Sequence, residues 1–563
     1  MFGEINTSTK TADFDIIFDG ELYNAPELRR ELALPPDCSD AEIFMSAYAK
    51  WHEKCLEKFN GAFALAIWDN NKKSLFFARD KIGMKPLFYA RAGDLFIIAS
   101  DISDILNKIP AEIDSQAVAE IILIGPGRTP GYGIFKNIEE LQPGFYGIFK
   151  IFENCKLTKH KYWDLTDRPH SDNFEQTAEY VRHLVLDSVK RRMSSNICTF
   201  LSGGLDSSII TSIAAEHFKE HGITLHSFSL DYEDNAKHFS ANKFQPERDA
   251  EYIAHMREYL RNKSVHIEHH QVTLSNSQLA DTLYESVTAR GLPGMADIDA
   301  SLLLFCREVG KSSKTALSGE GADEIFGGYP WYRDKNIRER YGFPWSQSTE
   351  FRKLFFSENF AHLKTNAANY VNERYTQALA SADISQNIYK TDDKADKIAK
   401  DERRVKELVN LNMKWFMQTL LERQNKMSQA GGVNIRAPFC DYRIAEYLYN
   451  IPWECKDYNN TEKGLLRMAM RDILPEEVLW RKKSPFPKTY NPEYLGAVSK
   501  MLAKIINEPS SPLLLIADKH ALSNLIALAP DVAWYGQLMN APQIIAYFVQ
   551  VNYWMKKYKV RIV

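Results

Sequence analysis

Residues 201–208, Leu-Ser-Gly-Gly-Leu-Asp-Ser-Ser, have the types and spacing of a phosphate-binding turn. The apolar run 197–200 before them predicts a buried strand, and residues 209–215 after them predict a helix. Glycines let backbone N–H groups approach an anion, and the start of a helix favours negative charge. Asp206 adds a carboxylate of the kind that holds magnesium on a phosphate chain. We call this segment the glycine-serine loop; the alternative interpretation is an ordinary strand-to-helix turn.

The glycine-serine loop differs from the P-loop of kinases and ATPases. The Gly-Lys-Ser tripeptide at residues 310–312 would need a glycine at position 305, where Phe305 stands. The loop instead resembles the pyrophosphate loop of the ATP pyrophosphatase superfamily, whose members split ATP into AMP and pyrophosphate to activate a carboxyl or carbonyl oxygen. The resemblance implies that ATP is bound by Leu201, Ser202, Gly203, Gly204, Leu205, Asp206, Ser207 and Ser208.

A second segment, residues 317–329, reads Leu-Ser-Gly-Glu-Gly-Ala-Asp-Glu-Ile-Phe-Gly-Gly-Tyr. We call it the acidic loop, because its carboxylates would be costly to bury without partners. If the strand before it joins the same sheet, Asp323 would share a magnesium ion with Asp206. Glu320 would then accept a proton from an attacking amine. A plain acidic turn is the alternative interpretation.

Together the two loops resemble the synthetase domain of the asparagine synthetases. Further stretches match this family in the same order, namely residues 226–230, 421–428, 436–441, 462–467 and 480–483. The resemblance implies that Leu230 packs on the adenine and that Ser318 and Gly319 contact ATP. It also implies that Lys463 contacts phosphate and stabilises charge at an adenylate. Taken alone, Lys463 would be interpreted as a surface lysine.

The N-terminal part of the chain resembles the glutamine amidotransferase domain that accompanies this synthetase. Residues 19–24, Asp-Gly-Glu-Leu-Tyr-Asn, match a glutamine-binding segment, although the family has asparagine where Asp19 stands. Residues 39–42, 61–64 and 78–89 match further family segments. The resemblance implies a remnant of the glutamine-binding set, made of Asp19, Gly20, Glu21 and Asp40.

One part of the family pattern is missing at the start of the chain. The family's glutaminase attacks glutamine with an N-terminal cysteine, whereas residue 2 here is Phe2 and the nearest cysteine is Cys38. An arginine-rich segment that grips the glutamine carboxylate is also missing. We therefore expect an N-terminal truncation, through the gene model, a late start codon or a disrupted gene, with true loss of the glutaminase as the alternative. An in-frame Met-Cys-Gly some tens of codons upstream would confirm truncation, and an in-frame stop would contradict it.

Two different domains are predicted to carry these segments. Up to about residue 160 the chain is β-rich, with a hairpin predicted by the apolar runs 63–68 and 75–78 and further strands at 95–98 and 146–149. The polar stretch 164–173 is the best boundary, and Asn173 at its end is predicted to cap a helix.

The predicted fold is of mixed α/β and α+β class. Residues 1–163 are expected to form a glutamine amidotransferase-like domain, an incomplete β-sandwich of the N-terminal-nucleophile type. Residues 174–563 are expected to form the ATP-pyrophosphatase synthetase domain, because alternating strands and helices predict a parallel sheet. By the resemblance this domain is similar to the adenine-nucleotide α-hydrolases and ends in a helical region.

Composition excludes several classes of protein. The 563 residues are 45% hydrophobic and 25% charged, which is typical of a globular chain. A net charge of −3 gives no sign of a nucleic-acid partner. No apolar run reaches the ~18 residues of a membrane span. The seven cysteines lack CxxC spacing, which favours reduced thiols and a cytoplasmic location.

The sequence thus predicts an ATP-dependent ligase that amidates aspartate. The β-carboxylate of aspartate would attack ATP and release pyrophosphate, and ammonia would convert the β-aspartyl adenylate into asparagine and AMP. Nitrogen comes from glutamine in the intact family and would come from ammonia for this chain as written. The implied cofactors are ATP and Mg²⁺, the partners are small molecules, and a homodimer is the assembly considered.

The predicted acceptor site departs from the family pattern. The family often holds the α-carboxylate of aspartate with an arginine, whereas the matching segment 294–301 carries Asp297 and Asp299. These acids would repel a carboxylate unless a cation intervenes, and would bind the α-ammonium of the substrate instead. Two alternatives therefore stay open. One is a β-lactam-synthetase-like cyclase or related amide ligase acting on another amino-acid carboxylate, and the other is a degenerate nucleotide-binding remnant.

Overall fold

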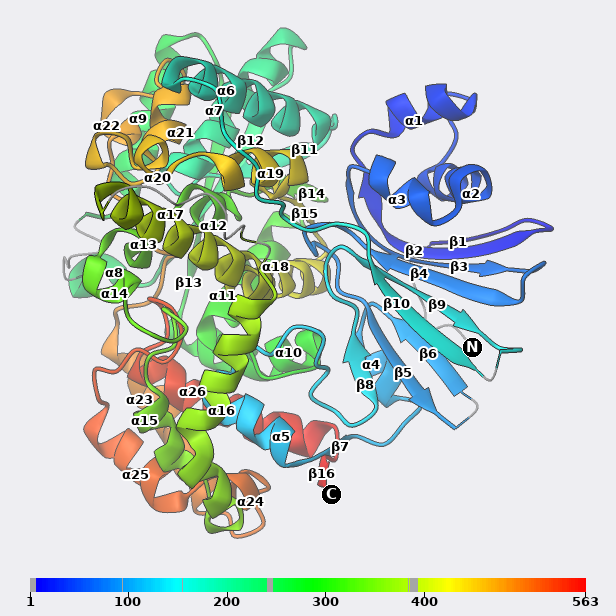
Figure 1. Cartoon of the computed structure of the whole chain (residues 1–563). Helices are drawn as coiled ribbons and strands as arrows, with labels where there is room; N and C mark the ends of the chain where they lie inside the picture. Colours follow the sequence, from blue (N-terminus) through cyan, green and yellow to red (C-terminus); the bar gives the residue numbers. More distant parts are fainter. Residues whose placement is uncertain (1–6, 94, 154, 240–246, 383, 385–392) are drawn as a thin grey trace. The chain divides into compact units, whose positions relative to one another are not determined.

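The computed structural model describes residues 7–93, 95–153, 155–239, 247–382, 384 and 393–563 (Figure 1). The chain divides into two compact units. The first is made of Met1–Ala117, Arg128–Leu165 and Tyr558–Val563, and the second of Val118–Gly127 and Thr166–Lys557. Each unit therefore contains segments that are far apart in the sequence.

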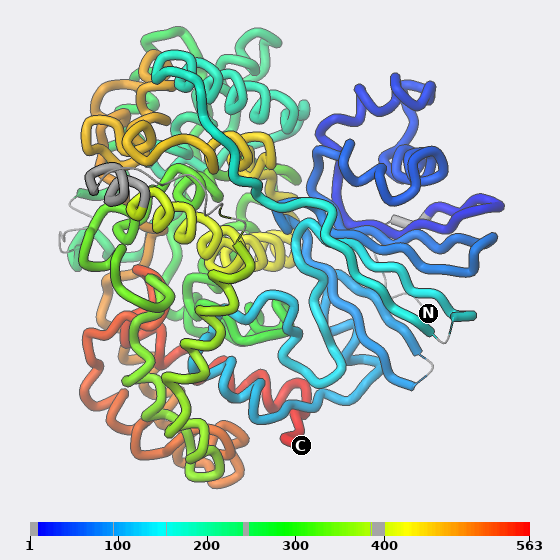
Figure 2. Tube along the Cα trace, viewed as in Figure 1, coloured from blue at the N-terminus to red at the C-terminus, as the bar shows by residue number. Residues whose placement is uncertain are grey.

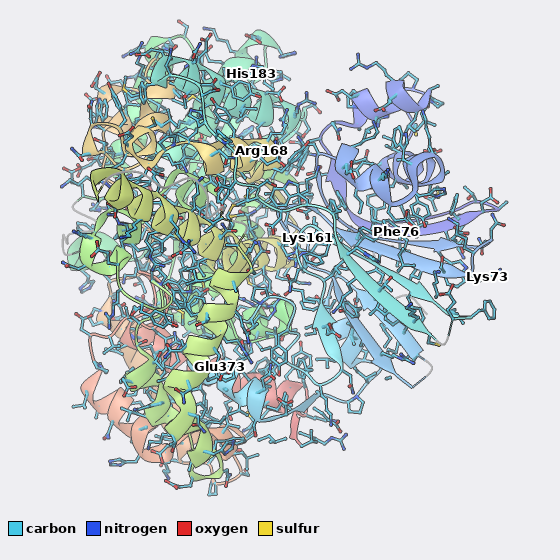
Figure 3. All side chains as sticks on the ribbon, in the orientation of Figure 1. Lys73, Phe76, Lys161, Arg168, His183 and Glu373 are labelled. Atoms are coloured by element: carbon cyan, nitrogen blue, oxygen red, sulfur yellow. The ribbon has the colours of Figure 1, made fainter. Side chains whose placement is uncertain are left out.

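A six-stranded antiparallel sheet forms the centre of the first unit, in the order β1-β2-β3-β4-β9-β10. Its strands are β1 (Thr7–Lys10), β2 (Phe14–Leu22), β3 (Gly61–Asp69), β4 (Ser74–Arg79), β9 (Phe145–Lys150) and β10 (Lys156–Lys161). The hairpin predicted from the sequence is confirmed as β3 and β4. Figure 3 shows Lys73 at its turn and Phe76 farther along β4.

Both faces of this sheet are covered, because successive side chains of β4 point to opposite sides. Phe76 stacks on Tyr48 with ring centroids 4.8 Å apart, whereas Phe77 meets Tyr89 at 5.5 Å. Helices α1 (Ala25–Leu32), α2 (Asp40–Trp51) and α3 (Cys55–Lys58) thus cover one face. A second sheet of β5 (Phe88–Ala92), β6 (Leu95–Ala99) and β8 (Ile138–Glu140) covers the other. The unit is completed by α4 (Ile102–Leu106) and by β7 (Glu112–Ile113) paired with β16 (Arg561–Ile562).

A five-stranded parallel sheet forms the centre of the second unit, as the sequence predicts. Its order is β13-β12-β11-β14-β15, with β11 (Ile197–Phe200), β12 (Leu225–Tyr232), β13 (Ile267–Leu274), β14 (Thr315–Leu317) and β15 (Asn434–Arg436). The chain runs from β11 to one edge and then returns to the other side of β11. Open parallel sheets bind ligands at the carboxyl ends of the strands where the order reverses in this way. Here that place lies between the ends of β11 and β14.

Helices cover both faces of the parallel sheet. On one face Thr211 of α7 (Leu205–Glu220) donates a hydrogen bond to Thr199 at 3.0 Å. Cys198 points to the opposite face and shares an apolar core with α11 (Asp297–Val309) and α18 (Met417–Ala430). Asn173 caps α6 (Phe174–Arg191), as predicted, and α6 packs on α7. The glycine-serine loop is therefore held between β11 and α7.

The remainder of the second unit is helical. Its longer helices are α9 (Asp249–Asn262), α10 (Asn276–Arg290), α16 (Ala361–Ala380), α17 (Asp393–Leu411), α19 (Tyr442–Asn450), α23 (Pro492–Ile506), α25 (Lys519–Leu528) and α26 (Ala541–Lys557). Its shorter ones are α5 (Ser115–Ala119), which spans the unit boundary, α8 (Asn235–His238), α12 (Ala322–Phe326), α13 (Pro330–Arg333), α14 (Lys335–Arg338), α15 (Thr349–Arg352), α20 (Trp453–Lys456), α21 (Gly464–Ala469), α22 (Glu476–Leu479) and α24 (Leu513–Ile516). In Figure 2 the red helix α26 lies beside the orange α23.

Candidate active site

The glycine-serine loop and the acidic loop meet at the carboxyl ends of β11 and β14. These strands are neighbours in the sheet, with Thr199 opposite Leu317. A Cβ atom at Gly319 would lie 3.0 Å from Cβ of Asp206, so a larger residue there would push the two loops apart. The structure thus brings together the two loops that the sequence predicts to share a site.

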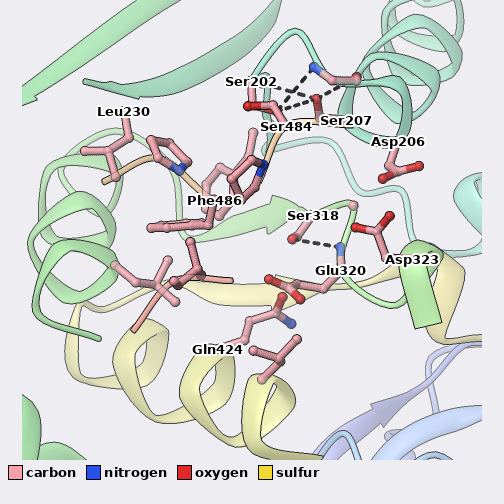
Figure 4. A pocket seen from close by; sticks show the side chains of 18 of the residues that line it. Ser202, Asp206, Ser207, Leu230, Ser318, Glu320, Asp323, Gln424, Ser484 and Phe486 are labelled. Carbon is pink, nitrogen blue, oxygen red and sulfur yellow. Dashed lines mark hydrogen bonds between the residues drawn. The ribbon is translucent and has the colours of Figure 1, made fainter. Parts of the chain in front are cut away.

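The glycine-serine loop is shaped by its own hydroxyl groups (Figure 4). Ser207 Oγ donates to the carbonyl of Gly204 at 3.1 Å and accepts from the backbone N–H of Ser202 at 3.2 Å. Gly203 has a φ of +70°, and a Cβ atom there would lie 2.7 Å from Tyr252. Gly204 is the N-cap of α7, which leaves the first N–H groups of this helix without helical partners. The turn is therefore suited to an anion.

Two carboxylates and two lysines form a chain of ion pairs beside the loops. Lys463 Nζ lies 2.6 Å from Asp206 Oδ2 and 2.8 Å from Asp323 Oδ1. Lys483 Nζ lies 2.7 Å from Asp323 Oδ2. Asp206 and Asp323 therefore hold one cation between them. Figure 4 shows both acids at the same end of the pocket.

The charges of this chain shift one another's pKa values. Burial alone would raise the pKa of Asp323, but Lys463 and Lys483 outweigh it and hold that pKa well below its usual range. Burial would likewise lower the pKa of Lys463, yet Asp206 and Asp323 raise it. Asp323 and Lys463 are therefore charged at neutral pH. Two carboxylates around one cation also fit magnesium, which prefers carboxylate and phosphate oxygens.

Glu320 lies in the acidic loop beside α18. Its Oε1 accepts a hydrogen bond from Arg423 Nη2 at 2.9 Å. Burial raises the pKa of Glu320, and Arg423 opposes that shift. A carboxylate whose pKa is raised binds a proton more tightly than an exposed one does. The position suits the general-base role expected for Glu320.

The opposite end of the pocket is apolar. It is lined by Leu230 on β12 together with Phe200, Phe228 and Phe486. Figure 4 shows Leu230 and Phe486 at the end away from Asp206 and Asp323. Apolar walls with a few polar groups are typical of sites for purine-sized ligands. The pocket therefore runs from apolar walls, past the glycine-serine loop, to the ion-pair chain.

Most of the residues expected to bind ATP line this pocket. They are Leu201, Ser202, Gly204, Asp206, Ser207, Leu230, Ser318 and Gly319. Gly203, Leu205 and Ser208 are not among its described lining residues. Leu205 and Ser208 are buried in the first turn of α7. These three residues shape the loop rather than face the cavity.

Asp297 and Asp299 engage groups inside the protein. Asp299 Oδ2 lies 3.2 Å from Arg290 Nη1, and both side chains are buried. Asp297 Oδ2 accepts a hydrogen bond from Gln543 at 3.2 Å. Neither acid is among the described residues that line the pocket. Arg290, and more weakly Arg423, therefore compensate the charge of Asp299. Binding of a substrate α-ammonium by Asp297 or Asp299 stays a prediction.

The residues of the predicted glutamine-binding remnant contact neighbouring groups of the first unit. Asp19 Oδ1 lies 2.9 Å from Lys85 Nζ, and Asp40 Oδ2 accepts from the backbone N–H of Leu22 at 2.8 Å. Glu21 accepts from the hydroxyl of Tyr23 at 3.2 Å. At Gly20 a Cβ atom would lie 2.0 Å from the carbonyl oxygen of Ala62, so only glycine fits.

Comparison with known proteins covers both units. A family model described as asparagine synthase matches residues 180–556, and one described as glutamine amidotransferase domain matches residues 5–163. The chain is 42% identical to asparagine synthetase [glutamine-hydrolyzing] 3 of Bacillus subtilis, over 98% of this chain and 88% of that protein. The chain belongs to the asparagine synthetase family. The resemblance seen in the sequence is confirmed.

Other relatives of this asparagine synthetase family member are more distant. Asparagine synthetase [glutamine-hydrolyzing] 1 of Bacillus subtilis is 28% identical over 88% of this chain and 78% of that protein. A protein of Gibberella zeae named amidase chry2 is 22% identical over 87% of this chain and 79% of that protein. Among the described helices, none combines the length and the apolar character needed to cross a membrane.

Three polar residues of the pocket have no role in the sequence-based account of the family site. Lys483 is one of two adjacent lysines, and only the fold shows which one faces Asp323. Arg423 and Gln424 lie in the matching stretch 421–428, and both line the pocket from α18. Which residues of a helix face a site depends on its rotation against neighbours, which sequence spacing alone does not give.

Proposed function

We propose that this chain makes asparagine from aspartate, ATP and ammonia through a β-aspartyl adenylate. Family membership supports the overall reaction, ATP-dependent synthesis of asparagine. The observation that carries the proposal is the chain of ion pairs joining Asp206, Lys463, Asp323 and Lys483 beside a phosphate-binding turn. Such a cluster places two lysine cations where pyrophosphate would leave, and it offers two carboxylates that could hold magnesium.

The residues of the pocket would each hold a different part of ATP. The adenine would pack on Leu230 and the neighbouring aromatic walls. The phosphates would lie on the glycine-serine loop, against the start of α7. Magnesium held by Asp206 and Asp323 would neutralise charge on the departing phosphates.

The first step activates the carboxylate. An oxygen of the β-carboxylate of aspartate attacks the α-phosphorus of ATP. The bond from that phosphorus to the oxygen bridging to the β-phosphorus breaks, and pyrophosphate leaves with this oxygen. Negative charge builds on the departing group, and Lys463 and Lys483 stabilise it.

The second step forms the amide. The nitrogen of ammonia attacks the β-carbonyl carbon, the bond from this carbon to the phosphate oxygen breaks, and AMP leaves. The nitrogen gives up a proton, which Glu320 accepts. Arg423 holds Glu320 by a hydrogen bond of 2.9 Å and fixes the direction of its carboxylate.

Ammonia is the nitrogen donor that we propose for the chain as given. A glutaminase needs an activated nucleophile, and thiols become reactive when their pKa is lowered. Burial instead raises the pKa of Cys38 and of Cys55 in the first unit. Neither thiol is therefore activated for attack on glutamine.

Product analysis tests this function. Incubation with aspartate, ATP and ammonium should give asparagine, AMP and pyrophosphate in equal amounts. Replacing ammonium by glutamine should give far less asparagine. ADP and phosphate as products would contradict the proposal. AMP formation from a substituted amino acid without any amine would favour the cyclase alternative, and nucleotide binding without turnover would favour the degenerate remnant.

A further inference from the structure

Part of the Arg423 guanidinium has no hydrogen-bond partner among the described residues. Its side chain is 2% exposed and lines the pocket from α18. Nη2 donates to Glu320, but Nε and Nη1 are buried and have no hydrogen-bond partner among the described residues. A buried donor without a partner costs free energy comparable to a lost hydrogen bond. In a pocket such donors indicate a ligand that completes them.

The next residue on α18, Gln424, adds a hydrogen-bond acceptor without a described partner. Gln424 is buried and lines the same pocket, and its Oε1 has no hydrogen-bond partner in the described part of the chain. Figure 4 shows the Gln424 amide directed toward Glu320. The wall formed by α18 therefore offers both cationic donors and a neutral acceptor beside the proposed base.

Arg423 is paired with Glu320 through Nη2 and acts electrostatically on Asp299, but its Nε and Nη1 groups remain for an anionic acceptor. Lys463 and Lys483 are paired with the acids of the ion-pair chain. Among the described lining residues, Arg423 is the one arginine. Its Cζ lies 4.7 Å from the centre of the Phe486 ring, which restricts the plane of the guanidinium. A fixed, partly unpaired guanidinium is the group that best recognises a carboxylate.

We propose that Arg423 binds the α-carboxylate of the amino-acid acceptor through its free N–H groups, and that Gln424 Oε1 accepts from the α-ammonium. This inference rests on the proposed function. The subsite selects a zwitterionic α-amino acid and leaves its side-chain carboxylate to reach the α-phosphate. The cation required for the acceptor comes from α18 and not from the segment 294–301, where Arg290 already compensates Asp299.

The test compares aspartate with β-alanine, which is aspartate without the α-carboxylate. Aspartate-dependent exchange of labelled pyrophosphate into ATP, measured without ammonia, reports adenylation and does not need Glu320 as a base. Arg423→Met should lower kcat/KM for aspartate about 100-fold. The KM for ATP and the inhibition constant of β-alanine against aspartate should stay within about twofold. Arg423→Lys should recover part of the loss, because it keeps the charge.

Matched variants separate recognition from folding. Arg404→Met removes a largely buried arginine that does not line the pocket, and it should leave aspartate kinetics unchanged. Gln424→Leu should weaken the binding of aspartate about tenfold. Gln429→Leu, at an exposed position of the same helix, should leave the binding of aspartate unchanged.

The outcomes distinguish this inference from the proposed function. If Arg423→Met weakens the binding of β-alanine and ATP as much as the binding of aspartate, Arg423 acts only by supporting the pocket and the inference fails. The inference fails also if Arg423→Met leaves aspartate kinetics unchanged. If the unaltered protein shows no aspartate-dependent exchange at all, the proposed function itself fails.

Discussion

The proposed phosphate-binding end and the proposed acceptor-binding end of the pocket are built differently. At the phosphate end, Asp206 and Asp323 are paired with Lys463 and Lys483. At the acceptor end, Arg423 and Gln424 keep buried polar groups without partners. A ligand at the first end must exchange existing ion pairs for new ones. A ligand at the second end would form hydrogen bonds with polar groups that have no partner among the described residues. Substitutions at the first end should therefore affect stability as well as activity, and substitutions at the second mainly affect specificity.

The largest effect is expected at the centre of the ion-pair chain. Lys463→Met removes the cation between two buried carboxylates, which should lower adenylation about 1000-fold and destabilise the unit by about 3–5 kcal/mol. Pyrophosphate exchange and the thermal midpoint measure the two effects. Lys482→Met, at the exposed lysine beside Lys483, is the control. Exchange near the unaltered rate in Lys463→Met would show that the ion-pair chain is only structural.

A smaller and more selective effect is expected at Glu320. Glu320→Gln should lower asparagine formation about 100-fold, because the amide cannot accept the proton. Pyrophosphate exchange with aspartate should fall less than about tenfold. The ratio of the two rates is the measurement. An equal loss of both rates would assign Glu320 to ATP or aspartate binding instead.

Asp297 should affect stability in a pH-dependent way. Burial raises its pKa from 3.8 to about 6, so the folded protein holds this proton more tightly than the unfolded chain. That contribution to stability is present at low pH and is lost as pH rises through about 6. Asp297→Asn stays neutral at all these pH values. Its free energy of unfolding, relative to that of the unaltered protein, should therefore rise by about 1.4 kcal/mol from pH 5 to pH 8.

The thermal midpoint at both pH values measures this gain. Asp281→Asn, at an exposed position of α10, is the control and should show no such trend. A stability difference that is constant from pH 5 to pH 8 would mean that Asp297 is ionised throughout this range.

The smallest effect is expected outside the second unit. Asp19 is paired with Lys85 within the first unit and has no role in the proposed synthetase chemistry. Asp19→Asn should leave ammonia-dependent asparagine formation within about twofold. A loss greater than tenfold would show that the glutamine-binding remnant controls the synthetase site.

Much of this fold could be predicted because its signals are local. The glycine-serine loop lies between an apolar strand and a helix, and Asn173 is directly followed by the helix that it caps. The parallel sheet follows from the alternation of strands and helices. These patterns span a few residues each and do not depend on distant partners.

The acceptor end could not be predicted, because its partners are distant in the sequence. The sequence puts Asp299 in the segment that matches the family's acceptor site, but it does not show that Arg290 on α10 compensates this acid. The unpaired groups of Arg423 depend on how α18 is rotated against the acidic loop, about a hundred residues earlier. Spacing identifies candidate residues of a site, but long-range packing decides which charges remain available.

Isotope transfer shows whether the side-chain carboxylate is activated as an adenylate. Aspartate labelled with ¹⁸O in its β-carboxylate is converted with ATP and ammonium, and the AMP is examined by mass spectrometry. One labelled oxygen is expected in the phosphate of each AMP, because that oxygen stays on phosphorus when the amide forms. AMP without label, or label released in inorganic phosphate together with ADP, would rule out a β-aspartyl adenylate.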